Sequence, residues 1–300
     1  LPALPQMKAI RYKDEVFPSI AVEKNLCYSP GDPVSAHRFD WYEPQNDSTL
    51  TRPLVIWMHG GGFRFGSKNM KSIRIWCRFF ARRGYVCAAI NYRLGKKSLN
   101  FGFDDLVKNC YQALGDVRLA IAWFKANAIR LRIDTSRIIL AGNSAGGMLA
   151  LQVAYGTDAA LLQLLHNPDS ASASHHVDPG RIAAVINFWG GIFDTAWLRN
   201  ARVPIVSVHG TEDPIMPYGH KSFPLFGSGD IQRVAGSLGI PSRLKKYPGY
   251  SHELQKHFNP LIVTASTRRR QLEAAQFAAD FIAAELFGEA GGGMPAEGSR

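Results

Sequence analysis

The sequence of 300 residues has few cysteines, no long apolar run and no metal-binding motif. Its four cysteines form no Cys-x-x-Cys pair and are too sparse for a disulfide framework. We therefore predict buried free thiols, while a bridge between Cys77 and Cys87 stays open. No apolar stretch approaches the roughly 18 residues of a membrane span, so we predict no transmembrane helix. The motif His-Glu-x-x-His is absent as well, and we predict no metal and no cofactor.

Acidic residues are missing from one long segment. Between Ser48 and Phe103 there is no Asp or Glu, yet this segment holds eleven basic side chains. The rest of the chain carries 24 basic and 24 acidic groups, so the whole net charge of +11 arises in this basic stretch. Such a surplus is typical of a solvated basic face or of a surface that attracts an anionic partner. Recognition-helix and aromatic-interleaved motifs are absent, and we predict no nucleic-acid partner.

The composition favours one folded domain. With 46% hydrophobic and 20% charged residues, the chain can bury a large core, which disfavours disorder and collagen-like repeats. We predict a single domain over residues 1–290 and a disordered tail over residues 291–300. The chain opens at Leu1 without a visible signal peptide. Its Pro-rich start is typical of a processed end, so our expectation for the compartment is secreted or periplasmic rather than cytoplasmic.

Apolar runs alternate with helical patterns along most of the chain, which predicts an α/β fold. The expected strands are Ile20–Cys27, Val34–Tyr42, Leu54–Met58, Tyr85–Tyr92, Arg137–Ala141, Ile182–Phe188, Val203–His209 and Ser242–Tyr247. The expected helices are Met70–Arg83, Leu106–Ala126, Ala145–Tyr155, Asp230–Leu238 and Ala265–Phe287. The two early runs alternate in polarity as antiparallel edge strands do, whereas the later runs are apolar as buried parallel strands are. We expect a mostly parallel sheet covered by helices on both faces.

The strongest functional motif is Gly142-Asn143-Ser144-Ala145-Gly146, which lies between an apolar strand and a helix of small residues. A sharp strand-to-helix turn brings backbone segments too close for a Cβ, and this explains glycine at both ends of the motif. The same turn exposes the serine hydroxyl above the sheet. We predict that Ser144 is a catalytic nucleophile.

A second glycine-rich motif, His59-Gly60-Gly61-Gly62, follows the strand that ends at Met58. Consecutive glycines let backbone amides turn toward one point, where they can stabilise an oxyanion. The motif lacks the Gly-Lys-Ser/Thr ending of a phosphate-binding loop. We predict an oxyanion hole made of the amides of Gly61, Gly62 and Ala145.

A nucleophilic serine needs a base and a carboxylate that orients the base. His252 lies in a loop directly after the last predicted strand, and Asp213 follows the strand that ends at His209. Loops at the carboxyl ends of strands are where α/β folds build such sites. We assign His252 as the base and Asp213 as the acid, with Glu212 and Asp194 as competitors for the acid.

These motifs resemble the α/β-hydrolase superfamily, in the esterase and lipase branch that carries a His-Gly-Gly-Gly motif. The resemblance covers the chain from about Leu54 to Phe287 and includes the order serine, acid, histidine. It implies an α/β-hydrolase fold and acyl transfer to water through an acyl-enzyme. Only about fifteen residues, Gly190 to Pro204, separate two strands where relatives often carry a cap. We therefore expect a minimal or absent cap and an open cleft.

Three cations, Arg64, Lys68 and Lys71, follow the oxyanion motif, and we predict that they bind anionic groups of the substrate. In a hydrolase without a cap, this combination is similar to the poly(aspartic acid) hydrolases, which cut amide bonds in a polyanion. A carboxylesterase for small or aryl neutral esters is the alternative. A non-catalytic binding module on the same fold is the alternative from another class, and a homodimer stays open.

Overall fold

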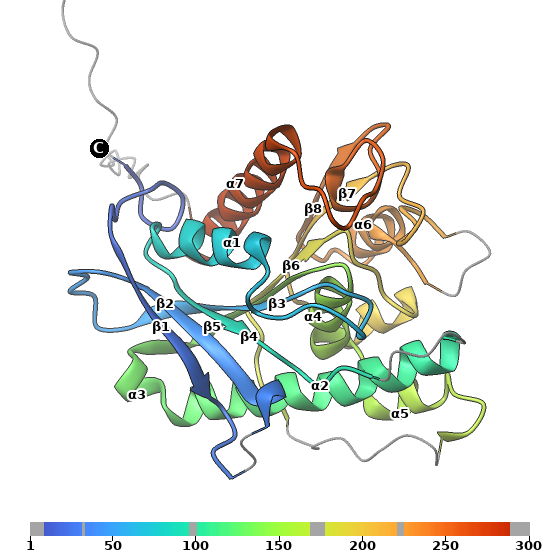
Figure 1. Cartoon of the computed structure of the whole chain (residues 1–300), viewed down its shortest axis with the longest axis horizontal. Helices are drawn as coiled ribbons and strands as arrows, with labels where there is room; N and C mark the ends of the chain where they lie inside the picture. Colours follow the sequence, from blue (N-terminus) through green and yellow to red (C-terminus); the bar gives the residue numbers. More distant parts are fainter. Residues whose placement is uncertain (1–8, 32–33, 96–100, 169–177, 221–224, 289–300) are drawn as a thin grey trace, which may run out of the picture.

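The computed structural model describes residues 9–31, 34–95, 101–168, 178–220 and 225–288. Eight strands form one sheet in the order β1-β2-β4-β3-β5-β6-β7-β8 (Figure 1). Their bounds are β1 (Ile20–Cys27), β2 (Arg38–Pro44), β3 (Arg52–Met58), β4 (Val86–Ile90), β5 (Ile133–Asn143), β6 (Ala184–Phe188), β7 (Ile205–Gly210) and β8 (Ser242–Tyr247). Strand β2 pairs antiparallel with β1 and with β4, and the remaining neighbours are parallel. The predicted tail, residues 291–300, lies outside the described residues.

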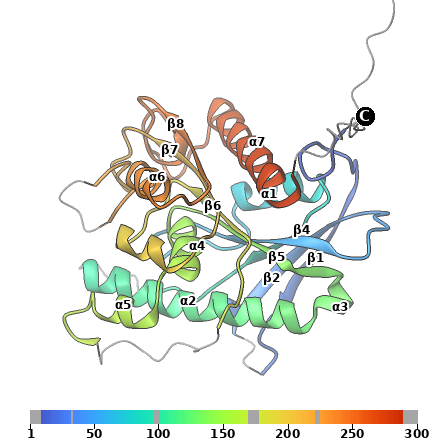
Figure 2. The same ribbon diagram turned by 180° about the vertical axis from the view of Figure 1, so that it is seen from behind.

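Helices cover both faces of this sheet. They are α1 (Lys71–Ala81), α2 (Phe103–Ala126), α3 (Ala128–Leu131), α4 (Ala145–Tyr155), α5 (Asp158–Leu162), α6 (Ser228–Ser237) and α7 (Ala265–Phe287), with short 3-10 helices η1 (Ser35–His37), η3 (Thr195–Asn200) and η4 (His252–Leu254). Helices α1 and α7 lie on one face, and α2 and α4 lie on the other (Figures 1 and 2). Between β6 and β7 the described chain carries only η3, so no helical cap stands there. The α/β-hydrolase fold predicted from the sequence is confirmed.

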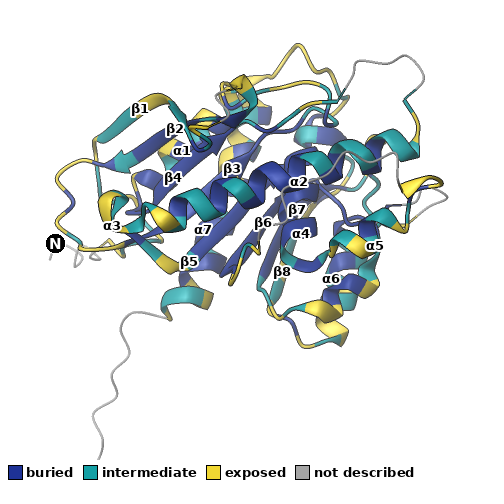
Figure 3. Cartoon of the chain, turned by 90° about the horizontal axis from the view of Figure 1, so that it is seen from below, coloured by how far each residue is buried: buried dark blue, intermediate teal, exposed yellow. Residues whose placement is uncertain are grey.

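The core has one layer on each side of the sheet. In β3, the side chains of Leu54, Ile56 and Met58 join the layer under α2 and α4. Those of Val55 and Trp57 join the layer under α1 and α7. Because successive side chains of a strand point to opposite faces, a central strand covered on both sides is apolar throughout. The buried stripe of α2 against the sheet is visible in Figure 3. Within the described residues, no helix combines the length and hydrophobicity that a membrane span requires.

Two strands begin four residues away from their predicted starts, whereas the other strand ends lie within two residues of the prediction. The second strand begins at Arg38 rather than Val34, because the residues before it turn into η1 and bury His37 against Asp116 of α2, Nε2 to Oδ1 3.2 Å. Strand β5 begins at Ile133 rather than Arg137. It pairs with β3 from its first residue, but the register shifts between Pro53 and Leu54, and this irregularity hides the early pairing from the sequence pattern.

The cysteines are free thiols. Cys77 in α1 and Cys87 in β4 are fully buried in the same core layer, and no bond joins them. Burial raises the pKa of both thiols. Cys110 is also buried and free, so the prediction of buried thiols is confirmed for these three residues, and the bridge left open between Cys77 and Cys87 is not formed. Cys27 in β1 is free but only half-buried, so the prediction of burial is wrong for this residue.

Buried polar contacts fix the loop that follows β3. Nδ1 of His59 donates to the carbonyl of Gly60 at 2.7 Å, and the Tyr92 hydroxyl donates to the carbonyl of His59 at 2.6 Å. The rings of His59 and Tyr92 stack with centroids 4.3 Å apart. On the other side, Oδ1 of Asn143 accepts the amide hydrogen of Gly60 at 3.1 Å. The loop is thereby tied both to the segment after β4 and to the end of β5.

A buried cation anchors the far end of the same loop. Lys68 is 2% exposed, and its Nζ donates to Oδ1 of Asp40 at 2.6 Å and to Oδ1 of Asn25 at 2.8 Å. Its backbone amide donates to Oδ1 of Asn91 at 2.8 Å. These partners come from β2, β1 and the segment after β4. Lys68 therefore holds the loop to the antiparallel edge of the sheet.

Replacing Lys68 with methionine should lower the free energy of unfolding by about 3 to 5 kcal/mol, because Asp40 would keep a buried charge without its cation. Chemical denaturation measures this change. The exposed Lys71, three residues along the chain, provides the matched control: Lys71→Met should change stability by less than about 0.5 kcal/mol. Equal losses in the two variants would contradict the anchoring role.

The pH dependence of stability should carry a contribution from His59. Burial lowers its pKa to about 4, although the hydrogen bond to Gly60 acts in the opposite direction. The unfolded chain, in which a histidine titrates near about 6.5, therefore binds more protons than the folded chain between these two values. The free energy of unfolding should fall as pH is lowered from about 7 to 4, by an amount on the order of 3 kcal/mol from this group.

The measurement is urea denaturation of wild type and His59→Gln across this pH range. The variant should show a shallower loss of stability toward low pH. His257→Gln, at an exposed histidine, should keep the wild-type slope. If wild type and His59→Gln lose stability in parallel, burial of a neutral His59 is not the cause.

Candidate active site

Ser144 occupies a strained turn between β5 and α4. Its φ of 53° and ψ of −120° place it in a region that residues other than glycine rarely adopt. Glycine is required beside it: a Cβ on Gly142 would lie 2.3 Å from the carbonyl carbon of Gly146, and one on Gly146 would lie 2.0 Å from the carbonyl oxygen of Met58. The turn therefore packs the end of β5 and the start of α4 directly against the end of β3.

The structure brings Ser144, His252 and Asp213 together. Oγ of Ser144 lies 3.0 Å from Nε2 of His252, and Nδ1 of His252 lies 2.7 Å from Oδ2 of Asp213. The three side chains come from the ends of β5 and β7 and from η4, and all three residues are buried. Each distance is within hydrogen-bonding range for a nucleophile, a base and an orienting carboxylate. The ring of Phe258 packs edge-on against His252, with centroids 5.2 Å apart.

Asp213 is held as a carboxylate. Its Oδ1 accepts the amide hydrogens of Ile215 and Met216, each at 2.9 Å. Burial by itself raises the pKa of Asp213, but hydrogen bonds from His209 and His252 hold it well below its usual range. Both competitors for the acid lie elsewhere. The side chain of Asp194 accepts from Ala196 at the start of η3, and Glu212 is exposed.

Within the described ranges, the backbone amides of Gly61, Gly62 and Ala145 have no protein acceptor. Gly61 and Gly62 have φ values of 118° and 60°. A Cβ on Gly61 would lie 2.2 Å from the carbonyl oxygen of Phe65, so this tight turn needs glycine. Ala145 is the first residue of α4, where the amides of the first turn and the helix dipole favour negative charge.

The three predicted substrate cations are in different environments. Lys68 is buried in its contacts with Asp40 and Asn25, so the prediction that it binds substrate is wrong. Because Asp40 of β2 provides an acidic partner, the side chain of Lys68 is buried in the fold instead. Lys71 is exposed at the start of α1. Arg64 is half-buried, with its guanidinium 4.1 Å from the ring centroid of Phe101.

Three residues near Ser144 were missed by the motif-based prediction. Asn143 holds Gly60, Phe258 packs on His252, and His209 lies 3.3 Å from Oδ2 of Asp213. For His209, its position at the end of a strand before Gly210 was the available signal. For Asn143, the available signal was its place directly before the nucleophile in the Gly-x-Ser-x-Gly motif. Nothing in the spacing of the sequence indicates Phe258.

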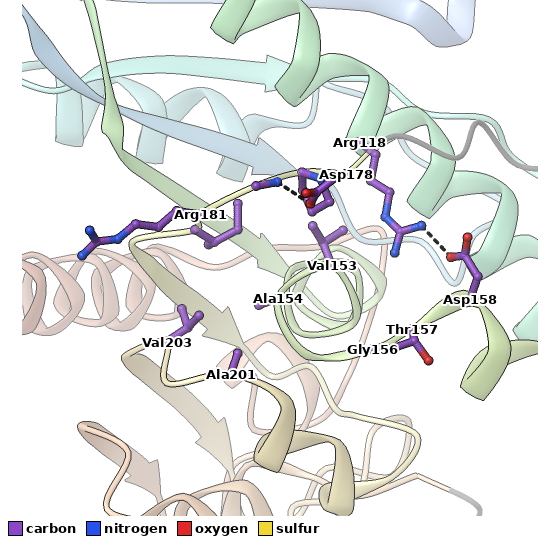
Figure 4. Close-up of a pocket in the computed structure, with 13 residues that line it drawn as sticks. Arg118, Val153, Ala154, Gly156, Thr157, Asp158, Asp178, Arg181, Ala201 and Val203 are labelled. Atoms are coloured by element: carbon purple, nitrogen blue, oxygen red, sulfur yellow. Dashed lines mark hydrogen bonds and ion pairs between the residues drawn. The ribbon is translucent and has the colours of Figure 1, made fainter.

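A separate cavity of about 670 Å³ lies at the opposite end of α4 from Ser144. Figure 4 shows that its wall combines apolar side chains with the ion pair between Arg118 and Asp158, whose atoms are 2.5 Å apart. Ser144, His252 and Asp213 do not line this cavity, so we do not assign it to the same site. Among the residues described, no cluster of three or more His, Cys, Asp or Glu side chains could hold a metal ion.

The chain is similar to known esterases and to a deacetylase. The arylacetamide deacetylase of Bos taurus is 34% identical over 263 residues, which cover 76% of this chain and 59% of that protein. Esterase-5B of Drosophila persimilis is 34% identical over 107 residues, which cover 35% of this chain and 19% of that protein. The chain thus spans less than two thirds of the length of either relative.

Solved structures share the fold. Native esterase 2 of Thermogutta terrifontis aligns with a TM-score of 0.60 and 22% identity over 95% of this chain and 98% of that one. A truncated carbohydrate esterase from gut microbiota aligns with a TM-score of 0.60 and 18% identity over 88% and 96%. The BD-FAE family matches residues 39–195, more than half of the sequence. The chain belongs to the BD-FAE family, within the esterase and lipase group of α/β-hydrolases.

Proposed function

We propose that this protein is a serine hydrolase that cleaves carboxylic esters through an acyl-enzyme on Ser144. The observation that carries the proposal is the hydrogen-bonded series from Ser144 Oγ through His252 to Asp213, at 3.0 and 2.7 Å. The esterases among its relatives and structural neighbours support the same reaction class.

In the acylation step, His252 Nε2 takes the hydroxyl proton while Ser144 Oγ forms a bond to the ester carbonyl carbon. The carbonyl oxygen becomes an oxyanion, and the amides of Gly61, Gly62 and Ala145 are the donors we propose for it. When the intermediate collapses, His252⁺ gives the proton to the departing alkoxide, and the alcohol leaves. Asp213 stays ionised throughout and stabilises the imidazolium.

Deacylation repeats these transfers with water as the nucleophile. His252 takes a proton from water, the new C–O bond forms, and the intermediate releases Ser144 with the proton returned to Oγ. The products are a carboxylic acid and an alcohol. The sequence of steps needs no group besides the residues named and water.

Small or aryl neutral esters are the substrate class that we favour. Apolar side chains follow each part of the site along the chain: Phe65 after the glycines, Ile215 after Asp213 and Phe258 after His252. Phe65 is 49% exposed and Ile215 is 52% exposed, while Phe258 touches the His252 ring. Exposed apolar groups beside a reacting centre favour contact with an apolar acyl or alcohol group.

A polyanionic substrate such as poly(aspartic acid) is the second candidate, with amide bonds as the target. Arg64 and the exposed Lys71 lie next to the glycine motif in sequence and support attraction of carboxylates. The buried Lys68 contributes nothing to this attraction. The same acyl-enzyme chemistry applies, with His252⁺ protonating a leaving amine.

Hydrolysis of p-nitrophenyl acetate tests the nucleophile. Ser144→Ala should lower kcat by about 10⁴ to 10⁶-fold, because no other group can form the acyl-enzyme. A fluorophosphonate should add once to wild type, at Ser144 by peptide mass spectrometry, and should not add to the variant. Ser237→Ala, at an exposed serine of α6, is the control and should retain full activity. Wild-type turnover that survives in Ser144→Ala would overturn the proposal.

Charge reversal separates the two substrate classes. If the polyanion is a substrate, size-exclusion chromatography of poly(aspartic acid) should show shortening by wild type. The Arg64→Glu, Lys71→Glu double variant should then raise KM for the polymer several-fold, and added salt should slow polymer cleavage but not ester cleavage. Arg130→Glu, on α3, is the matched control because that exposed cation lies at the other end of the strands. Ester cleavage with an intact polymer would leave the neutral ester as the substrate class.

A further inference from the structure

A second buried histidine contacts the carboxylate of Asp213. His209 belongs to β7 and is 0% exposed. Its Nε2 lies 3.3 Å from Oδ2 of Asp213 and 2.9 Å from the carbonyl oxygen of Met216. Oδ2 is the same atom that His252 Nδ1 contacts at 2.7 Å. Two imidazole rings therefore lie against one carboxylate oxygen.

The other side of His209 leads to a buried polar series. Nδ1 of His209 lies 2.8 Å from Oγ of Ser228, the first residue of α6. Oγ of Ser228 accepts from Nδ2 of Asn187 in β6 at 3.2 Å. Oδ1 of Asn187 accepts the amide hydrogen of Gly190 at 3.0 Å. His209, Ser228 and Asn187 are all fully buried.

With a neutral His209 ring, these contacts fix the direction of each hydrogen bond in the series. The amide hydrogen of Gly190 requires the oxygen of Asn187, so Nδ2 of Asn187 must face Ser228 as a donor. On the other side, the carbonyl of Met216 and the carboxylate of Asp213 can only accept, so Nε2 of His209 carries a hydrogen. In the neutral ring Nδ1 is then an acceptor, and the Ser228 hydroxyl donates to it. At each contact in the series, one atom can therefore only donate a hydrogen bond and the other can only accept it.

We propose that His209 is a positioning residue, which acts on His252 through Asp213. Its N–H donates to the carbonyl of Met216 and also approaches Oδ2, the oxygen that His252 contacts, so it draws part of the negative charge of Oδ2 away from the catalytic ring. The backbone amides of Ile215 and Met216 hold the other oxygen. The polar series anchors this arrangement to β6 and α6. This inference rests on the proposed function, because it assigns a role to His209 in that reaction.

The consequence for pH follows from charge. Without the His209 donor, Oδ2 would present more negative charge to His252, and the imidazolium would gain stability. The acidic limb of the pH profile of kcat/KM, which reports protonation of the base, should then move upward. The other titratable groups near this pair are Glu253 of η4, Tyr218 before α6 and, in register with His209, the exposed Lys246 of β8. Burial raises the pKa of Glu253.

Two substitutions at position 209 separate the roles of the ring nitrogens. His209→Asn places a polar group near the position of Nδ1, where it can meet Ser228, but it is too short to reach Asp213. His209→Gln reaches the position of Nε2 with an N–H donor. We expect His209→Asn to lower kcat/KM for p-nitrophenyl acetate by about tenfold and to move the acidic limb upward by about half a unit. His209→Gln should recover part of both changes.

Ser228→Ala removes the donor to Nδ1 and should move the limb in the same direction by a smaller amount. The described residues also offer a matched control in another buried histidine–aspartate contact, His37 with Asp116. His37→Asn should lose stability and leave the acidic limb where it is. Urea denaturation of each variant at the assay pH gives the folded fraction, against which kcat/KM is corrected.

The results of these experiments distinguish failure of the inference about His209 from failure of the proposed function. If His209→Asn keeps the wild-type limb and loses activity only in proportion to its folded fraction, His209 is a core residue and the inference is wrong. A limb that moves equally in His37→Asn would also overturn it, because the shift would then reflect general loosening. If wild type itself hydrolyses no ester and takes no fluorophosphonate, the proposed function fails instead.

Discussion

Three backbone segments approach one another around Ser144 so closely that a Cβ at Gly142 or Gly146 would collide with the backbone. The end of β3, the end of β5 and the start of α4 meet there, and a Cβ on Gly146 would lie 2.0 Å from the carbonyl oxygen of Met58. This contact places the glycine loop after β3 beside the serine and aims the first amides of α4 at the same region. The positive φ of Ser144 is strain of about 1 to 3 kcal/mol that the buried parallel strands on both sides must hold. The site thus depends on the rigidity of the sheet.

The charged groups of the site depend on the same rigidity. Asp213 loses hydration on burial, yet it stays ionised because four N–H donors lie within 3.3 Å of its two oxygens. Those donors come from one short loop, one strand and η4, so a small displacement of any of them would leave a buried negative charge poorly solvated. The polar series behind His209 ties this cluster to β6 and α6. The same contacts therefore both stabilise the charge of the Asp213 carboxylate and fix its orientation.

The sequence predicted the parts of the site that local chemistry determines. Glycines at 142 and 146, the serine between them and the triple glycine after His59 each follow from one sharp turn, so a short window of sequence is enough. The positions of Asp213 and His252 follow from the rule that parallel strands end at one edge. The contacts of His209 with Ser228, and of Lys68 with Asp40, could not be predicted in this way. They join residues 19 and 28 positions apart, and only the packing of the sheet decides that these side chains turn inward.

The ion pairs of the basic stretch also could not be predicted from the sequence. Along the sequence it has no acidic residue, but in space Arg52 pairs with Glu43, Lys68 with Asp40, Arg82 with Glu15 and Arg93 with Asp116. All four acids lie outside the stretch, so the fold neutralises much of the charge that the sequence concentrates. The exposed cations that α1 presents are Lys71, Arg74 and Arg78. Among the described residues of the basic stretch, attraction of an anionic substrate would therefore rest mainly on the exposed cations of this helix, a smaller source than the composition suggests.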